Sequence, residues 1–179
     1  LKIKWGGYII SHNRIENNPK KGAAIQLIPT PTNLKKLRRF LGMCSWHLRD
    51  FQPDFVQLSS TLTSAHRKPN DKLPFGRVWK EPKLQKIFEK IKAHAAKCLV
   101  NNTFDPNCKD THLFFDWSRQ AVSAVLMQFG KIVRVAGRTC TDAESRYYAT
   151  KGEACGHNFA QNVFRNHLLC LSNFFSVTD

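Results

Sequence analysis

The sequence predicts a mixed α and β protein in two units, a mostly helical unit over residues 1–105 and an incomplete α/β domain over residues 106–179. Charge is the first observation behind this division, because residues 1–100 contain 20 Lys or Arg against 6 Asp or Glu, whereas residues 101–179 contain 8 against 7. Periodicity is the second, since apolar residues follow helical stripes in the first unit and strand-like runs in the second. A polar stretch that contains Pro106 separates the two units.

The overall composition indicates a folded protein with a polyanionic partner. Hydrophobic residues make up 42% of the 179 residues, which is enough for a core, and the formal net charge is +15. No apolar run approaches the roughly 18 residues that span a bilayer, and the N-terminus lacks a signal-peptide profile. We therefore expect an intracellular protein, cytoplasmic, nuclear or both, without a membrane partner. The chain starts at Leu1 rather than Met, so we also expect a fragment of something larger.

The six cysteines fit neither a zinc site nor a redox motif. No C-x-x-C pair occurs, and no Cys and His cluster has zinc-finger or zinc-knuckle spacing. We interpret them as small buried residues in a reducing compartment.

The first predicted element is a short strand at KWGGYIIS, residues 4–11, with Gly6 and Gly7 inside it. Glycines within a strand indicate a close approach of the backbone to a neighbour or a ligand. A plain hairpin corner accounts for them equally well.

A helix with one basic face is predicted in IPTPTNLKKLRRFLGM, where Thr32 is placed to cap it. Its apolar stripe consists of Leu34, Leu37, Phe40 and Leu41. The other side carries Lys35, Lys36, Arg38 and Arg39. A basic helix face is most often solvated, but this one belongs to the segment that carries nearly all the net charge. Contact with phosphates is therefore an equally good interpretation.

Two further segments complete the first unit. Residues 64–82 are rich in Pro, Lys and Asn, which predicts a loop. Pro82 then lies near a first helical position, and EPKLQKIFEKIKAHAAKCL predicts the best-formed helix of the chain. Its apolar stripe comprises Leu84, Ile87, Phe88, Ile91, Ala95 and Leu99.

The second unit has the predicted order strand, strand, strand, helix, strand. Strand-like runs occupy residues 112–115, 122–129 and 132–136, with a turn at Gly130 and Lys131. The final stretch, SNFFSVTD, predicts the fourth strand. Because a helix crosses over before it, this last strand should lie parallel to the first.

A capping box marks the start of the helix in this unit. Thr141, followed three residues later by Glu144, predicts a helix over residues 142–164. Gly152 and Gly156 weaken that helix, each by about 1 kcal/mol relative to Ala.

Three carboxylates can meet where the first and last strands of the second unit end. The apolar run HLFF leads into Asp116, and the last strand ends in Asp179 on the same side of the sheet. Glu153, partway along the crossover helix, can point to the same place. Such a set suits a hard divalent cation such as Mg²⁺, and three crowded anions without a cation would repel. The alternative is that Glu153 is a surface helix residue and Asp179 a frayed terminus.

These motifs, in this order, resemble the C-terminal half of a reverse transcriptase from a gypsy-type LTR retrotransposon. WGGYIIS is similar to the strand of the primer-grip region, F-L-G-H/Y-x-I-S. The stretch from NNPKKGAAIQLIP through LRRFLGM to QLSSTLT resembles the thumb and connection, with landmarks such as P-x-K-x-x-A-I and L-R-x-F-L-G. HLFFDWSRQAVSAVL resembles the opening of the ribonuclease H domain, and GRTCTDAESRYYATKGEA resembles S-R-x-L-x-x-A-E-x-x-Y-x-x-x-x-x-E. The resemblance covers nearly the whole chain.

The resemblance implies a catalytic site and its chemistry. Asp116, Glu153 and Asp179 would be the catalytic residues and the ligands of Mg²⁺ or Mn²⁺. In such an enzyme, two metal ions activate a water and stabilise the leaving oxygen as the RNA strand of an RNA–DNA hybrid is cut. Ser118, on the same strand face as Asp116, would leave room for the sugar–phosphate backbone.

The resemblance also implies nucleic-acid contacts in the first unit. The primer-grip-like residues are Gly6, Gly7 and Tyr8. The basic helix face comprises Lys35, Lys36, Arg38 and Arg39. The implied partners are an RNA–DNA hybrid or another nucleic acid and the remainder of the retroelement polyprotein.

Departures from the family pattern predict impaired activity. The polymerase motif Tyr-x-Asp-Asp is absent, so this chain cannot polymerise on its own. Trp117 replaces a small residue beside the expected substrate path, and Gly156 interrupts the helix that carries Glu153. The family's fourth carboxylate would lie beyond Asp179. These features indicate a truncated or decaying copy, and the alternative function is a nucleic-acid-binding remnant without chemistry.

Overall fold

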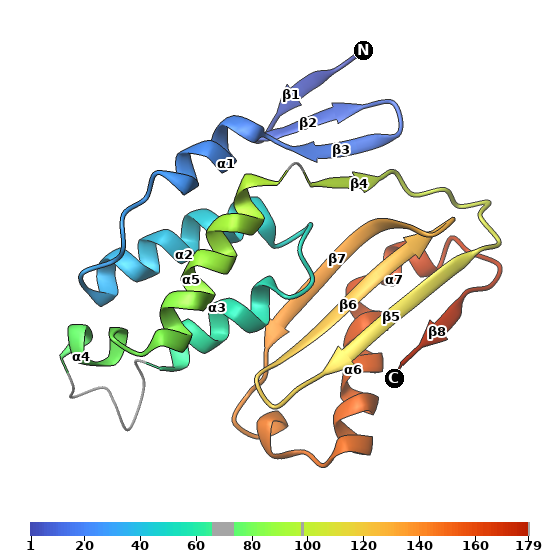
Figure 1. Ribbon diagram of the computed structural model, residues 1–179. Helices are drawn as coiled ribbons and strands as arrows, with labels where there is room; N and C mark the ends of the chain where they lie inside the picture. The colour runs from blue at the N-terminus through green and yellow to red at the C-terminus, as the bar shows by residue number, and fades with distance from the viewer. Residues whose placement is uncertain (66–73, 98, 179) are drawn as a thin grey trace.

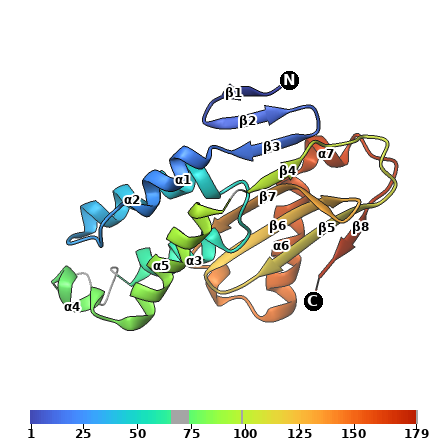
Figure 2. The ribbon, with the colours of Figure 1, turned by 45° about the horizontal axis from the view of Figure 1, so that its top comes forward.

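The computed structural model describes residues 1–65, 74–97 and 99–178 and has the predicted mixed α and β fold. Two four-stranded sheets lie beside a group of helices (Figure 1). The strand orders are β1-β2-β3-β4 in the first sheet and β7-β6-β5-β8 in the second. Turning the molecule brings the first sheet forward, above the helices, and shows helix α6 crossing one face of the second sheet (Figure 2).

The first sheet begins with a tight hairpin. Strands β1 (Ile3–Trp5) and β2 (Tyr8–Ser11) are antiparallel and are joined by Gly6 and Gly7. Both glycines have positive φ, +58° and +92°, which side chains with a Cβ rarely adopt. The hairpin interpretation of this stretch is therefore confirmed. The expected close approach of the backbone to a neighbour is also present, because a methyl group on Gly7 would overlap the Lys21 side chain.

Two more antiparallel strands connect this hairpin to a distant part of the chain. Strand β3 (Arg14–Asn17) pairs with β2 on one side and with β4 (Val100–Asn102) on the other. The buried side chain of Asn17 fixes the junction, because its amide nitrogen lies 3.0 Å from His47 Nε2 and its oxygen accepts a hydrogen bond from the Leu99 amide at 2.9 Å. Burial lowers the pKa of His47, which favours the neutral ring at this position.

Five helices follow the hairpin. They are α1 (Pro19–Gln26), α2 (Leu34–Leu48), α3 (Phe55–Ser64), α4 (Phe75–Trp79) and α5 (Pro82–Ala96). The loop predicted over residues 64–82 is wrong in part, because α4 forms within it, and residues 66–73 lie outside the described chain. The cap of α2 is Asn33 rather than Thr32, since the Asn33 side chain accepts the hydrogen bond from the Lys36 amide at 2.9 Å. Asn at this position is at least as good a cap as Thr.

The predicted apolar stripes of α2 and α5 form the core of the first unit. At most 1% of the surface of each of four residues is exposed, namely Leu37 and Phe40 of α2 and Phe88 and Ile91 of α5. The rings of Phe40 and Phe88 lie 4.5 Å apart. Leu34 and Leu41 of the same stripe are half-buried and pack against this core, and the basic side of α2 faces solvent.

The second sheet has the predicted parallel pair. Its strands are β5 (Thr111–Trp117), β6 (Ala121–Gln128), β7 (Lys131–Thr139) and β8 (Phe175–Val177). Strands β5, β6 and β7 are antiparallel neighbours, and β8 lies parallel to β5 with Phe114 opposite Val177. Helix α6 (Ala149–Val163) and the short α7 (Arg165–Leu168) connect β7 to β8.

Helix α6 begins later than predicted. The capping-box contacts form, because the Glu144 amide donates to Thr141 Oγ1 and the Thr141 amide donates to Glu144 Oε2. They cap a 3₁₀ turn of three residues rather than the α-helix. Tyr147 and Tyr148 then have extended backbone, with ψ of 146° and 162°. The carboxylate of Glu144 also binds a side chain of β7, and this tertiary contact holds the turn against the sheet.

The cysteines are less uniformly buried than predicted. Cys44 and Cys108 are buried, Cys140 and Cys155 are half-buried, and Cys170 is exposed. None of these five described cysteines forms a disulfide. None of the described helices is long and apolar enough to cross a membrane.

Candidate functional site

Strand β5 brings Asp116 to the end of the parallel pair. Asp116 is the last residue but one of β5 and its side chain is exposed. Its position is two residues beyond Phe114, which pairs with Val177 of β8. Asp179, the third predicted carboxylate, lies outside the described residues.

Helix α6 places Glu153 beside the C-terminal end of β8. The Thr178 hydroxyl donates a hydrogen bond to Glu153 Oε2 at 3.1 Å, and the Glu153 side chain is half-buried. One turn along α6, Gly156 lies directly over β5, because a Cβ at Gly156 would be 3.7 Å from the carbonyl carbon and oxygen of Asp116. Gly156 therefore lies in contact with the strand that carries Asp116, although a Cβ there would make only ordinary van der Waals contacts.

Two of the three predicted carboxylates are thus held on elements in contact. Neither Asp116 nor Glu153 forms an ion pair with a described cationic side chain, so their oxygens are available to a hard divalent cation. Within the described ranges, no three His, Cys, Asp or Glu side chains gather closely enough to hold a metal ion. The donor chemistry of the pair fits Mg²⁺, and the third predicted ligand, Asp179, is outside those ranges.

The residues that follow Asp116 have structural contacts. Trp117 packs under α6, where a methyl group on Gly152 would overlap its indole ring. Gly152 therefore makes room for the tryptophan that was expected beside the substrate path. Ser118 lies just after β5 rather than on its face, and its hydroxyl accepts hydrogen bonds from the amides of Gln120 and Ala121 in the β5–β6 turn.

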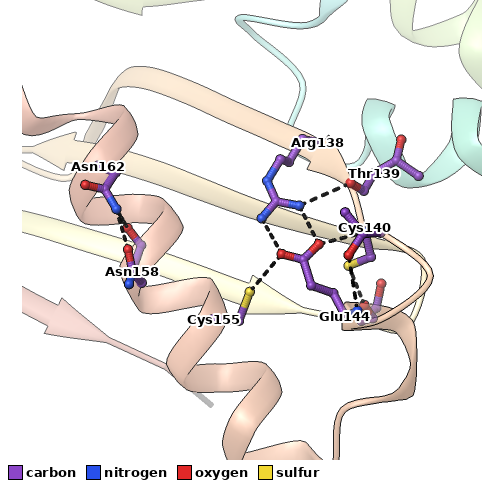
Figure 3. Close-up of polar contacts among 9 residues, drawn as sticks. Arg138, Thr139, Cys140, Glu144, Cys155, Asn158 and Asn162 are labelled. Carbon is purple, nitrogen blue, oxygen red and sulfur yellow. Dashed lines mark hydrogen bonds and ion pairs between the residues drawn. The ribbon is translucent and has the colours of Figure 1, made fainter.

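A clasp between β7 and the turn before α6 was not predicted. Arg138 donates two hydrogen bonds of 2.7 Å to the carboxylate of Glu144, and Cys155 of α6 lies 3.5 Å from the same carboxylate (Figure 3). The bond to Arg138 and the amide of Thr141 lower the pKa of Glu144 from its ordinary 4.5 to about 2. Both members of the clasp occupy matched positions of S-R-x-L-x-x-A-E, which is the signal that identifies them.

A further contact ties the clasp region to the strand that carries Asp116. The Cys140 thiol donates a hydrogen bond to the Ser118 carbonyl at 3.3 Å. Burial is the largest cause of the raised pKa of Cys140, so the thiol stays protonated near neutral pH. The end of β7 is therefore bound both to the turn before α6 and to the end of β5.

The predicted basic face of α2 is exposed and free of ion pairs with described residues. Its members are Lys35, Lys36, Arg38 and Arg39. The ammonium group of Lys36 donates to Thr32 Oγ1 at 2.9 Å, and this contact leaves the positive charge uncompensated. The face can therefore attract a polyanion without first breaking an ion pair.

An aromatic residue that the sequence patterns did not single out continues this face. The indole of Trp46 is 60% exposed, and the Lys21 ammonium lies 5.9 Å from its ring centre. Both line a cavity of about 610 Å³ together with Arg39 and Met43. Its signal in the sequence is its spacing, because Trp46 falls seven residues after Arg39, on the same side of α2.

The primer-grip-like residues border this surface. A methyl group on Gly7 would come within 3.2 Å of the Trp46 indole nitrogen. The Tyr8 ring lies 6.5 Å from Trp46 and 5.8 Å from Phe51. Tyr8 is half-buried, and its hydroxyl donates to Asp50 at 3.4 Å. Gly6 contributes the turn.

Comparison with known sequences agrees with the motifs. A family model described as an RNase H-like domain found in reverse transcriptase matches residues 79–176, more than half of the chain. The retrovirus-related Pol polyprotein from transposon 297 of Drosophila melanogaster is 33% identical over 165 residues, 91% of this chain and 15% of that protein. The corresponding polyprotein from transposon gypsy of the same organism is 26% identical over 171 residues, 93% of this chain and 16% of that protein. The chain therefore spans about a sixth of these relatives.

Solved structures share the whole fold at low identity. A foamy viral protease-reverse transcriptase in complex with RNA/DNA hybrid has a TM-score of 0.73 at 15% identity. The matched region covers 99% of this chain and 24% of the viral chain. A second, in complex with double-stranded DNA, has a TM-score of 0.69 at 16% identity over 99% of this chain and 30% of its own. The fold, the motifs and the matched family model agree, and this chain belongs to the family of RNase H-like domains found in reverse transcriptases.

Proposed function

We propose that this chain binds an RNA–DNA hybrid and cuts its RNA strand with the help of Mg²⁺ or Mn²⁺, as part of a retrotransposon reverse transcriptase polyprotein. The hydrogen bond between Thr178 and Glu153 is the observation that carries the proposal. It holds one carboxylate beside the end of β8, the strand parallel to the one that ends near Asp116.

The chain's own residues would hold the metal through oxygen atoms. Asp116 would supply a carboxylate from the strand end, Glu153 one from the helix, and Asp179 the third. A bound divalent cation would supply an activated water and would neutralise charge on the leaving oxygen. The contribution of this fold is orientation, because Thr178 binds one oxygen of Glu153 and the close approach of Gly152 to Trp117 keeps α6 near β5.

Binding would come mainly from the first unit. The exposed cations of α2 are supported as phosphate contacts by their position on one face and by the exposed Trp46 beside them. Contacts of this kind neutralise phosphates without reading bases, so the affinity should be insensitive to base sequence and strongly dependent on salt.

The test measures cleavage and binding of a labelled hybrid separately. Asp116→Asn and Glu153→Gln should each abolish cleavage and leave the affinity within about twofold, because each keeps its shape and loses an anion. Asp142→Asn, in the exposed turn before α6, is a matched control that should cut as the wild type does. Cleavage at the wild-type rate by Asp116→Asn, or by a wild type treated with a chelator, would contradict the proposal. Tight binding by a wild type that cuts nothing would favour a non-catalytic nucleic-acid-binding function.

A further inference from the structure

A second cavity lies between α2 and the second sheet, at the β7 edge and not at the β5–β8 end where the carboxylates lie. Its volume is about 470 Å³. The polar and aromatic side chains of its lining include Tyr8, Ser45, Trp46, Arg49, Arg134 and His167, which come from the hairpin, from α2 and its C-cap, from β7 and from α7. Strand β7 is the strand of the second sheet drawn nearest to the helices (Figure 1). The cavity thus joins the two units of the molecule.

The cavity carries two uncompensated cations. Arg49 and Arg134 are both exposed, and neither forms an ion pair within the described part of the chain. Asp50 is the acidic residue of the lining, and it accepts a hydrogen bond from the Tyr8 hydroxyl. One anion against two cations leaves the cavity positive.

The charge of Arg134 acts across the cavity. Burial is the main cause of the lowered pKa of His167, and Arg134 lowers it further. Burial also raises the pKa of Tyr8, and there Arg134 acts in the opposite direction. His167 Nδ1 is buried and has no hydrogen-bond partner in the described chain. A neutral imidazole can donate one hydrogen bond from this position to an acceptor.

The cavity is continuous with the basic face of α2. Gly42 and Trp46 line both this cavity and the one that contains Lys21 and Arg39. Trp46 therefore stands between two positively charged hollows. A nucleic-acid strand that lies along the basic face of α2 would reach Arg49 and Arg134 after it passes the Trp46 indole ring.

We propose that this second cavity binds a phosphodiester group of the nucleic acid, held by Arg49 and Arg134, where the strand passes from α2 to the second sheet. Guanidinium groups suit this ligand, because each can donate two parallel hydrogen bonds to phosphate oxygens. Arg49 caps the C-terminus of α2, whose dipole places about half a negative charge there. Two full positive charges exceed that repulsion. The inference rests on the proposed hybrid binding and assigns it a second contact point.

The test is the salt dependence of hybrid binding by the full chain. Arg49→Gln together with Arg134→Gln should weaken binding at 100 mM salt by about tenfold and reduce the slope of log affinity against log salt by about 1, the value for one lost phosphate contact. Arg14→Gln with Arg77→Gln removes two exposed arginines elsewhere in the first unit and should change neither quantity. Arg49→Lys with Arg134→Lys should restore the slope, which a merely structural role would not do. Thermal unfolding of each variant checks that the fold is intact.

The outcomes separate this inference from the proposed function. Unchanged affinity and slope in the Gln pair, alongside a loss when the four α2 cations are neutralised, would overturn the cavity assignment and leave hybrid binding in place. No binding of hybrid by the wild type would overturn both. Saturable binding of a mononucleotide that depends on Arg49 and Arg134, without any effect of these residues on hybrid binding, would make the cavity a nucleotide site and overturn the inference.

Discussion

The two units of the molecule hold the residues proposed to bind and to cut nucleic acid in different ways. In the first, cations project from the exposed side of a helix whose other side is buried, and none of them has to meet another side chain. In the second, Asp116 and Glu153 come from a strand and a helix, and their separation depends on how closely α6 approaches β5. Binding should therefore tolerate small shifts of structure, whereas cleavage should not.

The largest expected effect is on binding by the first unit. Replacing all four basic residues of α2 with Gln should reduce the slope of log affinity against log salt by about 3 to 4, because each neutralised phosphate contributes about 0.9. The free energy of unfolding should change by less than about 0.5 kcal/mol, since these side chains are exposed and unpaired. Titrations of hybrid at several salt concentrations measure the slope, and an unchanged slope would move the binding surface elsewhere.

The close approach in the second unit predicts a large effect from one methyl group. Gly152→Ala should lower the free energy of unfolding by about 1 to 3 kcal/mol, because the new Cβ overlaps the indole of Trp117. Trp117→Ala should remove the overlap, so the double variant should lose less than the sum of the two single variants. Denaturant unfolding of the four proteins measures this coupling. Strict additivity would show that the ring and the helix do not compete for space.

The clasp offers a smaller effect within the second unit. Arg138→Ala should lower the free energy of unfolding by about 1 kcal/mol, because the Arg138 side chain is 38% exposed and water screens much of the ion pair. Cleavage should fall more than stability, since the clasp holds the turn that leads into α6. A variant that loses stability and retains full cleavage at saturating hybrid would separate the clasp from the site.

The same clasp predicts a dependence of stability on pH. The folded-state pKa of Glu144 is lowered to about 2, so its stabilising contribution is complete above pH 4.5 and is lost as the pH falls towards 2. Glu144→Gln should be less stable than the wild type at pH 6, and the difference should shrink in acid. Unfolding measured from pH 6 to pH 2 checks this, and a constant difference would show that Glu144 is not the titrating group.

The smallest expected effect is a control for the glycine argument. Gly42 in α2 has open space where a Cβ would be, so Gly42→Ala should stabilise the chain by about 0.4 to 1 kcal/mol. Gly42→Ala in the first unit and Gly152→Ala in the second should change the free energy of unfolding in opposite directions, so the two variants together compare the units. Destabilisation by both would mean that helix glycines serve another purpose here.

Local patterns predict the parts of this molecule that local chemistry decides. The apolar stripes of α2 and α5 and the parallel placement of β8 follow from helical period and from the crossover helix. The pairing of β3 with β4 does not, because the partners are more than eighty residues apart and each is short. The start of α6 could not be predicted either, because Glu144 of the capping box also binds Arg138 of β7, and a local pattern does not reveal this tertiary contact.

The candidate site shows the same limit at the level of single residues. Trp117 and Gly152 each look like a defect when considered alone, but together they fit, because the missing side chain of the glycine makes room for the indole ring. Asp116 and Glu153 were identified by type and spacing, and their placement on contacting elements follows from that packing. Trp46 was missed although it lies seven residues after Arg39, because a single exposed aromatic residue adds nothing to the apolar stripe that predicts the helix.

The most direct test of the division between the two units crosses two variants with two readouts. Hybrid affinity and cleavage at saturating hybrid would be measured for Asp116→Asn and for the α2 variant that lacks its four cations. We predict that Asp116→Asn binds as the wild type does and does not cut. The α2 variant should bind weakly and, once saturated, cut at the wild-type rate. Loss of binding in Asp116→Asn, or loss of saturated cleavage in the α2 variant, would contradict the account.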